Sequence, residues 1–331
     1  MRTPYRSRVA GIGSYLPERI LSNSDLEKMV DTNDQWIKER TGIERRHLAA
    51  KGEYTSDLCL KATERALQDA QMKATDLDLI LIATSTPDQV MPNTATVLQH
   101  KLGITGIPCL DVSAACSGFI YAISVADQFI RTGMYKNILV IGAEILHRMV
   151  NYKDRETCIL FGDGAGAWIL TQTDYDNKDG IFSTHLRANG EVGDLFVLPA
   201  GGSKIPFTQE VLDKSQHYVI MKGREIFRHA VRTLTECCQL ALKTNNLQSD
   251  QVDWLVPHQA NVRILDSVAE YFEIPKEKVI VSLHETGNTS AASIPVAFDM
   301  AVKEGKIKRG QMILLAAFGA GLTSGSALMR Y

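Results

Sequence analysis

Cys116 stands where a short apolar segment, 107–112, passes through small residues into a helix-like pattern. Apolar residues recur at helical spacing from Phe119 to Ile130, and the small residues beside Cys116 let another group approach the backbone. A thiol at a helix N-terminus lies next to unpaired N–H groups and the positive end of the dipole, which favour the thiolate. Because the same N–H groups can hold a developing oxyanion, this segment predicts a nucleophilic cysteine.

The alternative interpretation of Cys116 is a small, buried and inert core residue, because free cysteine is among the most buried residue types. The other five cysteines are interpreted as core residues, since they lie in apolar or helical patterns without glycine-rich surroundings: Cys59, Cys109, Cys158, Cys237 and Cys238. No pair has C-x-x-C spacing, which argues against a zinc site or a disulfide framework. Scattered thiols without a secretion signal predict a reducing cytoplasm.

Two more polar residues follow predicted strands in the second half of the chain. His258 ends the strand expected over 252–257, and Asn288 follows the strand expected over 279–282, in the position where Cys116 follows its own strand. Sites in such sheets form at the carboxyl ends of strands, so two packed halves would bring the three residues toward one cleft. A lone histidine there would usually be structural, but three polar groups at equivalent strand ends favour a catalytic site.

The elements that would position these residues occur twice. The first half has the order helix, strand, helix, strand at 56–70, 77–83, 94–102 and 108–112, and the second half repeats it at 231–243, 252–257, 263–272 and 279–282. Strands at 136–141 and 166–169 are matched by strands at 310–315 and 326–329. A repeat of about 170 residues is too long for a solenoid unit and indicates two similar α/β halves. We place them at 1–175 and 176–331, with a variable connecting segment over about 176–218.

The N-terminal region carries helix signals and a possible nucleotide contact. Ser24 and Glu27 have the spacing of a capping box, and Asn33 or Thr32 is expected to cap a helix over 34–41 that Gly42 ends. Trp36 and Arg40 would share one face of that helix, where they could hold the base and phosphate of a nucleotide. From the spacing alone, a Trp36 packed on the body beside a solvated Arg40 is at least as good an interpretation.

Composition excludes several classes of protein. With 331 residues and 45% hydrophobic content the chain can bury a large core, and a net charge of −2 argues against a nucleic-acid partner. The longest apolar run, 312–322, is interrupted by glycines and is shorter than the roughly 18 residues that a membrane helix needs. The glycines in 161–166 do not fit a dinucleotide fingerprint, because a strand follows them.

Taken together, these motifs resemble the 3-oxoacyl-[acyl-carrier-protein] synthase III family over essentially the whole chain. The segments that carry the resemblance are 11–17, 31–36, 40–43, 115–119, 161–166, 256–261 and 287–292. The resemblance implies a thiolase-like α/β fold, a five-layer α-β-α-β-α sandwich of two duplicated halves, and a homodimer.

The implied reaction is a decarboxylative condensation of an acyl-CoA primer, acetyl-CoA by default, with malonyl-acyl carrier protein. In that family's terms Cys116 takes the acyl group, and its backbone together with the loop of Phe318, Gly319, Ala320 and Gly321 holds the oxyanion. His258 Nε2 and the Asn288 amide then bind the malonyl thioester carbonyl, because neutral donors do not protonate the carbanion. No metal or cofactor is implied, since the CoA thioester is a substrate.

The resemblance also implies secondary contacts. CoA would meet Thr32, Trp36, Arg40, Arg155 and Asn261, the acyl pocket would contain Met91, Leu146 and Phe161, and the carrier protein would meet Arg228 and Arg263. Met91 stands where many relatives carry Phe and would reach into the partner subunit's pocket, where a flexible thioether would admit a longer or branched primer. The 201–216 loop looks longer than usual and has the alternative interpretation of an inert surface insertion, while Glu156 and the pair Glu270 and Tyr271 depart from the family pattern.

Three alternatives remain at this point. The nearest is a related condensing enzyme of secondary metabolism with a longer or branched primer. A cysteine hydrolase also pairs Cys with His and Asn, but it does not need a duplicated fold. A non-catalytic module that binds carrier protein is disfavoured because all three catalytic positions are filled.

Overall fold

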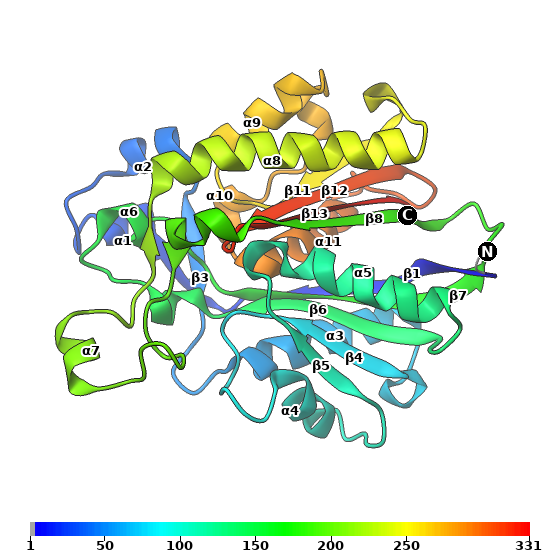
Figure 1. The fold of residues 1–331 in the computed structure, drawn as a ribbon, viewed down its shortest axis with the longest axis horizontal. Helices are drawn as coiled ribbons and strands as arrows, with labels where there is room; N and C mark the ends of the chain where they lie inside the picture. The colour runs from blue at the N-terminus through cyan, green and yellow to red at the C-terminus, as the bar shows by residue number, and fades with distance from the viewer. Residues whose placement is uncertain (1–3) are drawn as a thin grey trace.

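The computed structural model describes residues 4–331, which form two large β-sheets, two small two-stranded sheets and three helical layers (Figure 1). Helices α3 (Thr55–Ala70) and α4 (Thr94–Lys101) cover one outer face, and α8 (Gly223–Thr244) and α9 (Val262–Tyr271) cover the other. Between the sheets lie α5 (Gly118–Arg131) and α11 (Ser293–Lys303). This arrangement confirms the predicted five-layer sandwich.

The two sheets repeat one strand order, which confirms the predicted duplication. The first sheet has the order β1-β7-β6-β4-β5 and contains β1 (Tyr5–Tyr15), β4 (Leu79–Ala83), β5 (Cys109–Val112), β6 (Asn137–Glu144) and β7 (Gly164–Asp174). The second has the order β8-β13-β12-β11 and contains β8 (Gly180–Ala188), β11 (Trp254–Pro257), β12 (Met312–Gly319) and β13 (Thr323–Arg330). In the first sheet β6, β4 and β5 run parallel to one another, and in the second sheet β12 and β11 do. All other neighbouring strands in these two sheets pair antiparallel.

The strand expected over 279–282 is wrong, because only Val279 pairs with β11, through an isolated bridge to Leu255. The side chain of Gln259 takes the backbone groups that a longer strand would use. Its Nε2 donates to the Ile280 carbonyl at 3.0 Å, and its Oε1 accepts from the Ser282 N–H at 2.8 Å. The backbone is therefore satisfied without a ladder.

The segment expected to be a variable connection contains β8 at its start, and β8 pairs with β13 as an edge strand of the second sheet. It continues through the 3-10 helix η4 (Gly190–Leu195) into a small ribbon of β9 (Phe196–Val197) and β10 (Ile220–Met221). The loop between these strands carries α7 (Gln209–Asp213) away from the layered body (Figure 1).

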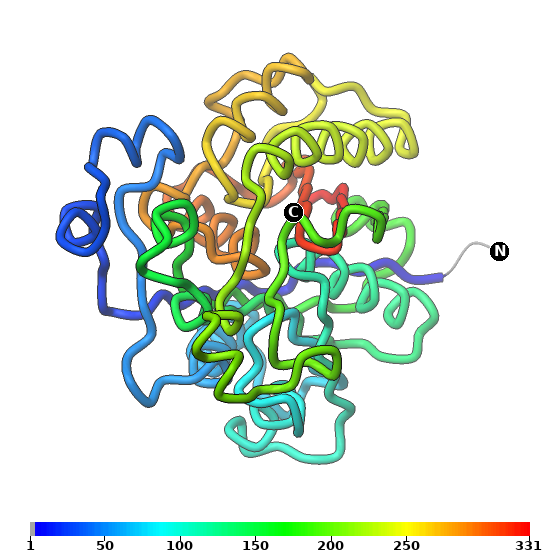
Figure 2. The backbone as a smooth tube through the Cα atoms, turned by 60° about the vertical axis from the view of Figure 1, so that its left-hand side comes forward, coloured from blue at the N-terminus to red at the C-terminus, as the bar shows by residue number. Residues whose placement is uncertain are grey.

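A cap of short elements covers one end of the sandwich. It contains β2 (Arg19–Ser22), α1 (Asn23–Leu26), α2 (Asp34–Thr41), β3 (Arg45–Leu48), α6 (Arg155–Cys158) and α10 (Leu283–Thr286). Although far apart in sequence, α2 of this cap and α9 of the outer helical layer lie side by side (Figure 2). Helix α2 has its predicted bounds, with Asn33 accepting from the Trp36 N–H and Gly42 in the left-handed conformation.

The predicted capping box lies two residues earlier than expected. Ser22, not Ser24, is the N-cap of α1, and it exchanges hydrogen bonds with Asp25. Glu27 instead accepts from the Asp34 N–H at 2.7 Å, so it holds the start of α2. The hydroxyls of Ser22 and Ser24 are hydrogen-bonded to each other, and sequence spacing alone did not distinguish the two serines.

The remaining elements are 3-10 turns: η1 (Ala74–Asp76), η2 (Ala115–Ser117), η3 (Leu146–Met149), η5 (Ser249–Gln251), η6 (Lys276–Lys278) and η7 (Ser290–Ala292). Residue Ala115 of η2 and residue Ser290 of η7 have φ of 46° and 49°, which marks these turns as counterparts in the two halves. The counterpart of Cys116 is therefore Ala291, and Asn288 lies three residues before it rather than in the equivalent position.

Apolar side chains fill each space between layers. The largest cluster joins the two middle helices to both sheets, where the Trp168 ring meets Phe119 and Phe298 edge-on at centroid distances of 5.1 and 4.7 Å. Among the cysteines predicted as core, Cys109 differs, because the edge strand β5 leaves it half-buried. Within residues 4–331 we find no helix with the length and apolar content that a bilayer crossing requires.

Candidate active site

Cys116, His258 and Asn288 line one cavity of about 560 Å³, so the structure brings together the three residues singled out from the sequence. Cys116 comes from the first half, between the two sheets, and the other two come from the second half. All three are buried, with exposed fractions of 6%, 1% and 7%. The cavity therefore lies where the duplicated halves meet.

Cys116 occupies the η2 turn that leads into α5. The sequence predicted that Cys116 would be a thiolate, but its surroundings in the structure favour the neutral thiol. Burial raises the pKa of the Cys116 thiol to about 12, the charge of Glu144 acts in the same direction, and a hydrogen bond with the Ser290 side chain opposes both. Removal from water penalises the charged form more than these contacts stabilise it. The resting nucleophile is a neutral thiol.

Gly319, the last residue of β12, lies directly against this turn. A Cβ at position 319 would stand 2.7 Å from the Cys116 nitrogen and 3.0 Å from the Ser117 nitrogen, distances that only glycine avoids. Phe318, Gly319 and Ala320 line the cavity, and so does Leu322, whereas Gly321 does not. The 318–320 segment therefore packs against the Cys116 turn and lines the same cavity, which places its backbone beside the position where an oxyanion would form.

His258 is a neutral imidazole. Burial lowers its pKa to about 3, since no water compensates a positive charge at this position. Its Nδ1 lies 2.7 Å from the Ser293 hydroxyl. When this hydroxyl donates to Nδ1, the ring carries its proton on Nε2 and can act there as a hydrogen-bond donor.

Asn288 is held by backbone and side-chain contacts. Its N–H donates to Leu160 at 2.8 Å and its carbonyl accepts from Gly162 at 3.0 Å, so the residue bridges to the strand-like start of the 161–166 segment. The side-chain Oδ1 accepts from the Ser290 N–H at 2.8 Å. Because the oxygen is engaged, the NH₂ of the amide is the group that remains for a ligand in the cavity.

The part of the cavity that the cap forms is lined by Trp36 and Arg40 from α2 and by Arg155 from α6. The guanidinium of Arg155 lies over the Trp36 ring at 4.8 Å and that of Arg40 lies 5.3 Å from its centroid. A nucleotide base stacked between Trp36 and Arg155 would therefore have to displace the arginine. Asn261 also lines the cavity and ties α9 to α2 by donating to the Arg40 carbonyl at 2.9 Å.

Thr32 is the expected CoA contact that does not line the cavity. Its buried hydroxyl has no recorded hydrogen-bond partner among the described residues.

Comparison with known proteins agrees with this geometry. The family model described as 3-oxoacyl-[acyl-carrier-protein] synthase III matches residues 110–190, and the model of its C-terminal part matches residues 242–331. The beta-ketoacyl-[acyl-carrier-protein] synthase III of Thiobacillus denitrificans is 50% identical, over 98% of this chain and 99% of the relative. The chain belongs to the 3-oxoacyl-[acyl-carrier-protein] synthase III family.

Other members of the family show the same similarity over the full length. The protein of that name from Xylella fastidiosa is 48% identical over 98% of both chains. The crystal structure of 3-oxoacyl-[acyl-carrier-protein] synthase III from Aquifex aeolicus VF5 matches with a TM-score of 0.90 and 45% identity, over 98% of this chain and 100% of that one. These matches confirm the family predicted from the sequence motifs.

The residues that the family resemblance placed in an acyl pocket are distributed differently in the structure. Phe161 lines the cavity and stacks on Phe196, with ring centroids 5.9 Å apart. Leu146 lies behind it in the same apolar cluster without reaching the cavity. Met91 is 84% exposed and lies outside the cavity of its own chain.

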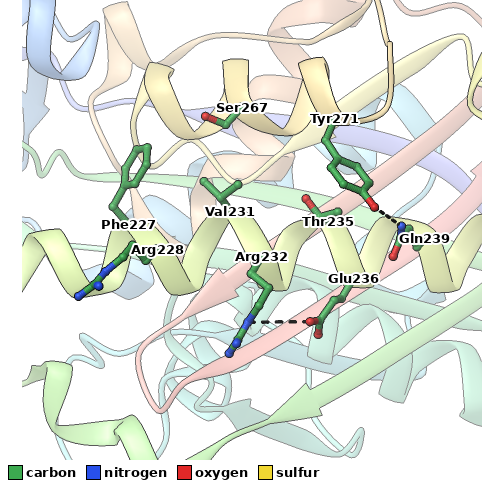
Figure 3. A pocket seen from close by; sticks show the side chains of 9 residues that line it. All are labelled: Phe227, Arg228, Val231, Arg232, Thr235, Glu236, Gln239, Ser267 and Tyr271. Carbon is green, nitrogen blue, oxygen red and sulfur yellow. Dashed lines mark hydrogen bonds and ion pairs between the residues drawn. The ribbon is translucent and has the colours of Figure 1, made fainter.

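The two expected carrier-protein contacts lie at different places. Arg263 lines the active-site cavity, whereas Arg228 lines a second cavity of about 570 Å³ between α8 and α9 (Figure 3). Tyr271 reaches across that groove and accepts a hydrogen bond of 2.6 Å from Gln239. Phe227 lines both cavities, so the groove adjoins the active site.

Several residues of the site were missed from the sequence. Phe196 and Met221 line the cavity from the β9–β10 ribbon, which the connecting segment gave no reason to place there. Glu144 ends β6 and was detectable, because the rule that used the carboxyl ends of strands applies to it as well. Ser290 lies inside the 287–292 segment that carries the family resemblance, but its role depends on its contact with Glu144, which the sequence does not show.

Proposed function

We propose that this chain catalyses the decarboxylative condensation of a short acyl-CoA primer with malonyl-acyl carrier protein, giving 3-oxoacyl-acyl carrier protein, carbon dioxide and CoA. The observation that carries the proposal is the position of a cysteine at a helix N-terminus in one cavity with two neutral hydrogen-bond donors. This reaction starts type II fatty acid synthesis. The CoA thioester is a substrate, and the proposed steps require no metal or resident cofactor.

In the first half-reaction Cys116 Sγ attacks the thioester carbonyl of the primer, and CoA leaves. We assign the oxyanion to the N–H groups of Cys116 and of the 318–320 segment, because this segment packs against the Cys116 turn and lines the same cavity. We assign Trp36 and Arg155, with Arg40, Asn261 and Thr32, to CoA. We assign Phe161 and the partner subunit's Met91 to the acyl pocket, with Leu146 packed in the apolar cluster that supports Phe161.

In the second half-reaction malonyl-acyl carrier protein enters the same cavity. His258 Nε2 and the Asn288 NH₂ donate to the thioester carbonyl as carbon dioxide departs and an enolate forms. A neutral imidazole suits this role, since an imidazolium would be a strong enough acid to protonate the carbon. The enolate attacks acyl-Cys116, and the thioester to Cys116 breaks.

The proposal includes a homodimer, a cytoplasmic location and a carrier-protein contact. Val90 and Met91 form an apolar tip, 91% and 84% exposed, which a second subunit would cover. The free thiols of the chain suit a reducing compartment. Arg263 at the active site and Arg228 in the adjoining groove would attract the acidic surface of a carrier protein.

One experiment tests the assignment and the primer. The protein is incubated with a panel of straight and branched acyl-CoAs, and its intact mass is measured, after which malonyl-acyl carrier protein is added and carbon dioxide is followed. We expect one acyl adduct on Cys116 and condensation that Cys116→Ala abolishes. Absence of an adduct with every CoA ester would refute the proposal. Preference for a longer or branched acyl group would favour the related condensing enzyme of secondary metabolism.

The same assay separates the roles of the donors. Asn288→Ala should spare acylation and raise the decarboxylation barrier by about 2 to 4 kcal/mol, the effect of losing one oxyanion donor. An equal loss in both half-reactions would contradict the role assigned to Asn288.

A further inference from the structure

We propose that Glu144 takes up the thiol proton of Cys116 through the hydroxyl of Ser290 during acyl transfer. This inference rests on the proposed function, because it concerns the first half-reaction at the same cavity. Glu144 is a positioning and proton-holding residue, since it acts on the sulfur only through Ser290.

The path runs through three buried groups, Cys116, Ser290 and Glu144. Glu144 ends β6, and no part of it is exposed. Ser290, 3% exposed, donates from Oγ to Glu144 Oε1 at 3.1 Å. The η7 turn that carries Ser290 packs against the η2 turn of Cys116, and the Ser290 side chain acts to lower the pKa of the Cys116 thiol. Ser290 therefore connects the nucleophile of one half of the molecule to a carboxylate behind it. Its own N–H fixes the Asn288 amide oxygen, so one residue orients two site groups.

The rest of the Glu144 carboxylate is held by neutral donors. The Ser85 N–H lies 3.2 and 3.1 Å from its two oxygens, and the Thr86 hydroxyl donates to Oε2 at 2.7 Å. Thr84 contributes a longer contact of 3.4 Å from the end of β4. None of these partners is a cation, so the carboxylate keeps a proton affinity that an ion pair would remove.

The imidazole of His258 is not available for this proton. With Nδ1 engaged by Ser293, the ring needs its proton on Nε2 to support the enolate in the second half-reaction. A neutral ring in that form has no lone pair left on Nε2 to accept from Cys116. Burial also lowers the His258 pKa to about 3 and raises the Glu144 pKa to about 7, so of the two groups the carboxyl is the better proton acceptor.

The charges around Glu144 favour transfer of the Cys116 proton to Glu144 over loss of that proton to solvent. The charge of Glu144 acts on two thiols, Cys116 from η2 and Cys59 from α3, and burial raises the pKa of both, so neither carries charge at neutral pH. The elements carrying Thr84, Ser85, Thr86 and Ser290 present neutral groups. A thiolate beside an ionised Glu144 would place two negative charges in a buried site. Transfer of the proton from Cys116 to Glu144 keeps the negative charge of these two groups at one.

The transfer balances as follows. The Cys116 S–H bond breaks as an O–H bond forms on Ser290 Oγ, the original Ser290 O–H bond breaks, and a proton arrives on Glu144 Oε1. The sulfur attacks the acyl carbon, and the C–S bond to CoA breaks. Glu144 then releases its proton to the CoA thiolate, which leaves as the thiol. Ser290 and Glu144 end as they began.

The test compares single-turnover acetyl transfer from acetyl-CoA across pH in wild type and Glu144→Gln. At pH 7 the variant should transfer at least about 100-fold more slowly, as expected for loss of a general base. The wild-type rate should fall at acid pH with an apparent pKa near 7, because a protonated Glu144 cannot accept, and this acid limb should be absent from the variant. Ser290→Ala should also slow transfer at least tenfold.

Three controls make the outcome decisive. Glu144→Asp keeps the carboxylate and should keep the acid limb at a reduced rate, even if the Gln variant folds poorly. Asp127→Asn replaces another buried carboxylate, on α5 beside Ser7 and Arg131, and should stay within a few-fold of wild type. Enzyme acylated in advance at high pH should condense with malonyl-acyl carrier protein within a few-fold of wild type when it carries Glu144→Gln.

The inference is overturned if Glu144→Gln transfers acetyl at the wild-type rate, or faster, as removal of a repelling charge alone would predict. It is also overturned if condensation by the acylated variant falls as far as acyl transfer, which would indicate a structural role. Failure of wild type to form any acyl adduct would instead refute the proposed function.

Discussion

Replacement of Gly319 by alanine tests whether the close approach of β12 to the nucleophile turn builds the oxyanion site. The new Cβ would lie 2.7 Å from the Cys116 nitrogen, 3.0 Å from the Ser117 nitrogen and 3.1 Å from the Ala114 carbonyl oxygen. All three neighbours are backbone atoms of one turn, so no change of rotamer can make room. The turn or the end of β12 must move by several tenths of an ångström.

Two effects follow from that movement, and their sizes differ. Loss of one oxyanion donor costs about 2.7 to 4 kcal/mol, which corresponds to a decrease of roughly 10² to 10³ in kcat. Overpacking a tight site costs about 1 to 3 kcal/mol of folding stability. We therefore expect Gly319→Ala to lower acyl transfer about 100-fold or more while the protein still folds.

The assay is the rate of acyl-adduct formation by intact mass at saturating acyl-CoA, with thermal unfolding measured in parallel. Gly190→Ala is the matched control, because a Cβ at position 190 meets no atom within 4 Å. It should leave the rate within a few-fold of wild type. A Gly319→Ala protein that acylates at the wild-type rate would refute the inference that this contact positions the oxyanion donors.

Three further outcomes can be measured. Trp36→Ala should raise the KM for acyl-CoA about tenfold or more with kcat retained, since stacking of a base on an aromatic ring is worth about 1 to 3 kcal/mol, and an unchanged KM would exclude Trp36 from CoA binding. Arg46→Met should lower the free energy of unfolding in urea by about 3 kcal/mol, because the buried Ile159 carbonyl and Asn23 Oδ1 lose their donor. Because burial lowers the His258 pKa from 6.5 to about 3, the unfolded chain binds the extra proton and stability is lost as pH falls through that window. Wild type should therefore lose stability with acid faster than His258→Gln, by up to about 1.4 kcal/mol per pH unit, and parallel curves would contradict a buried neutral His258.

Residue types and repeat order were enough to predict which groups meet in the cavity. Cys116 and His258 come shortly after β5 and β11, whereas Asn288 follows an apolar run that pairs with β11 through one isolated bridge. The strand-end rule still brought the three residues to one edge, because it does not depend on distance along the chain. The ionisation of Cys116 was predicted in the wrong direction, because the helix N-terminus is visible in the sequence and the burial of the thiol is not. The pKa therefore needed the packed structure.

The errors in the fold have a similar origin. The apolar run 279–282 has the pattern of a strand, but the side chain of Gln259, about twenty residues earlier, takes its backbone hydrogen bonds. Likewise, β8 and the β9–β10 ribbon lie in a segment whose composition suggested only a connection. In both places a contact between distant residues decides the local structure.

The duplication also explains why the site forms between the halves and in neither one alone. Gly319 of β12 in the second half admits the Cys116 turn of the first, and Gly142 of β6 in the first half admits the η7 turn of the second, since a Cβ at position 142 would lie 2.1 Å from the Ala291 carbonyl oxygen. Each sheet thus uses one glycine to receive the other half's turn. The two turns have the same left-handed residue, Ala115 in one and Ser290 in the other. In the first half the left-handed residue is followed by the nucleophile Cys116. In the second half the left-handed residue is Ser290, whose side chain acts on the Cys116 thiol. Two equivalent turns have therefore diverged to play different roles in one site.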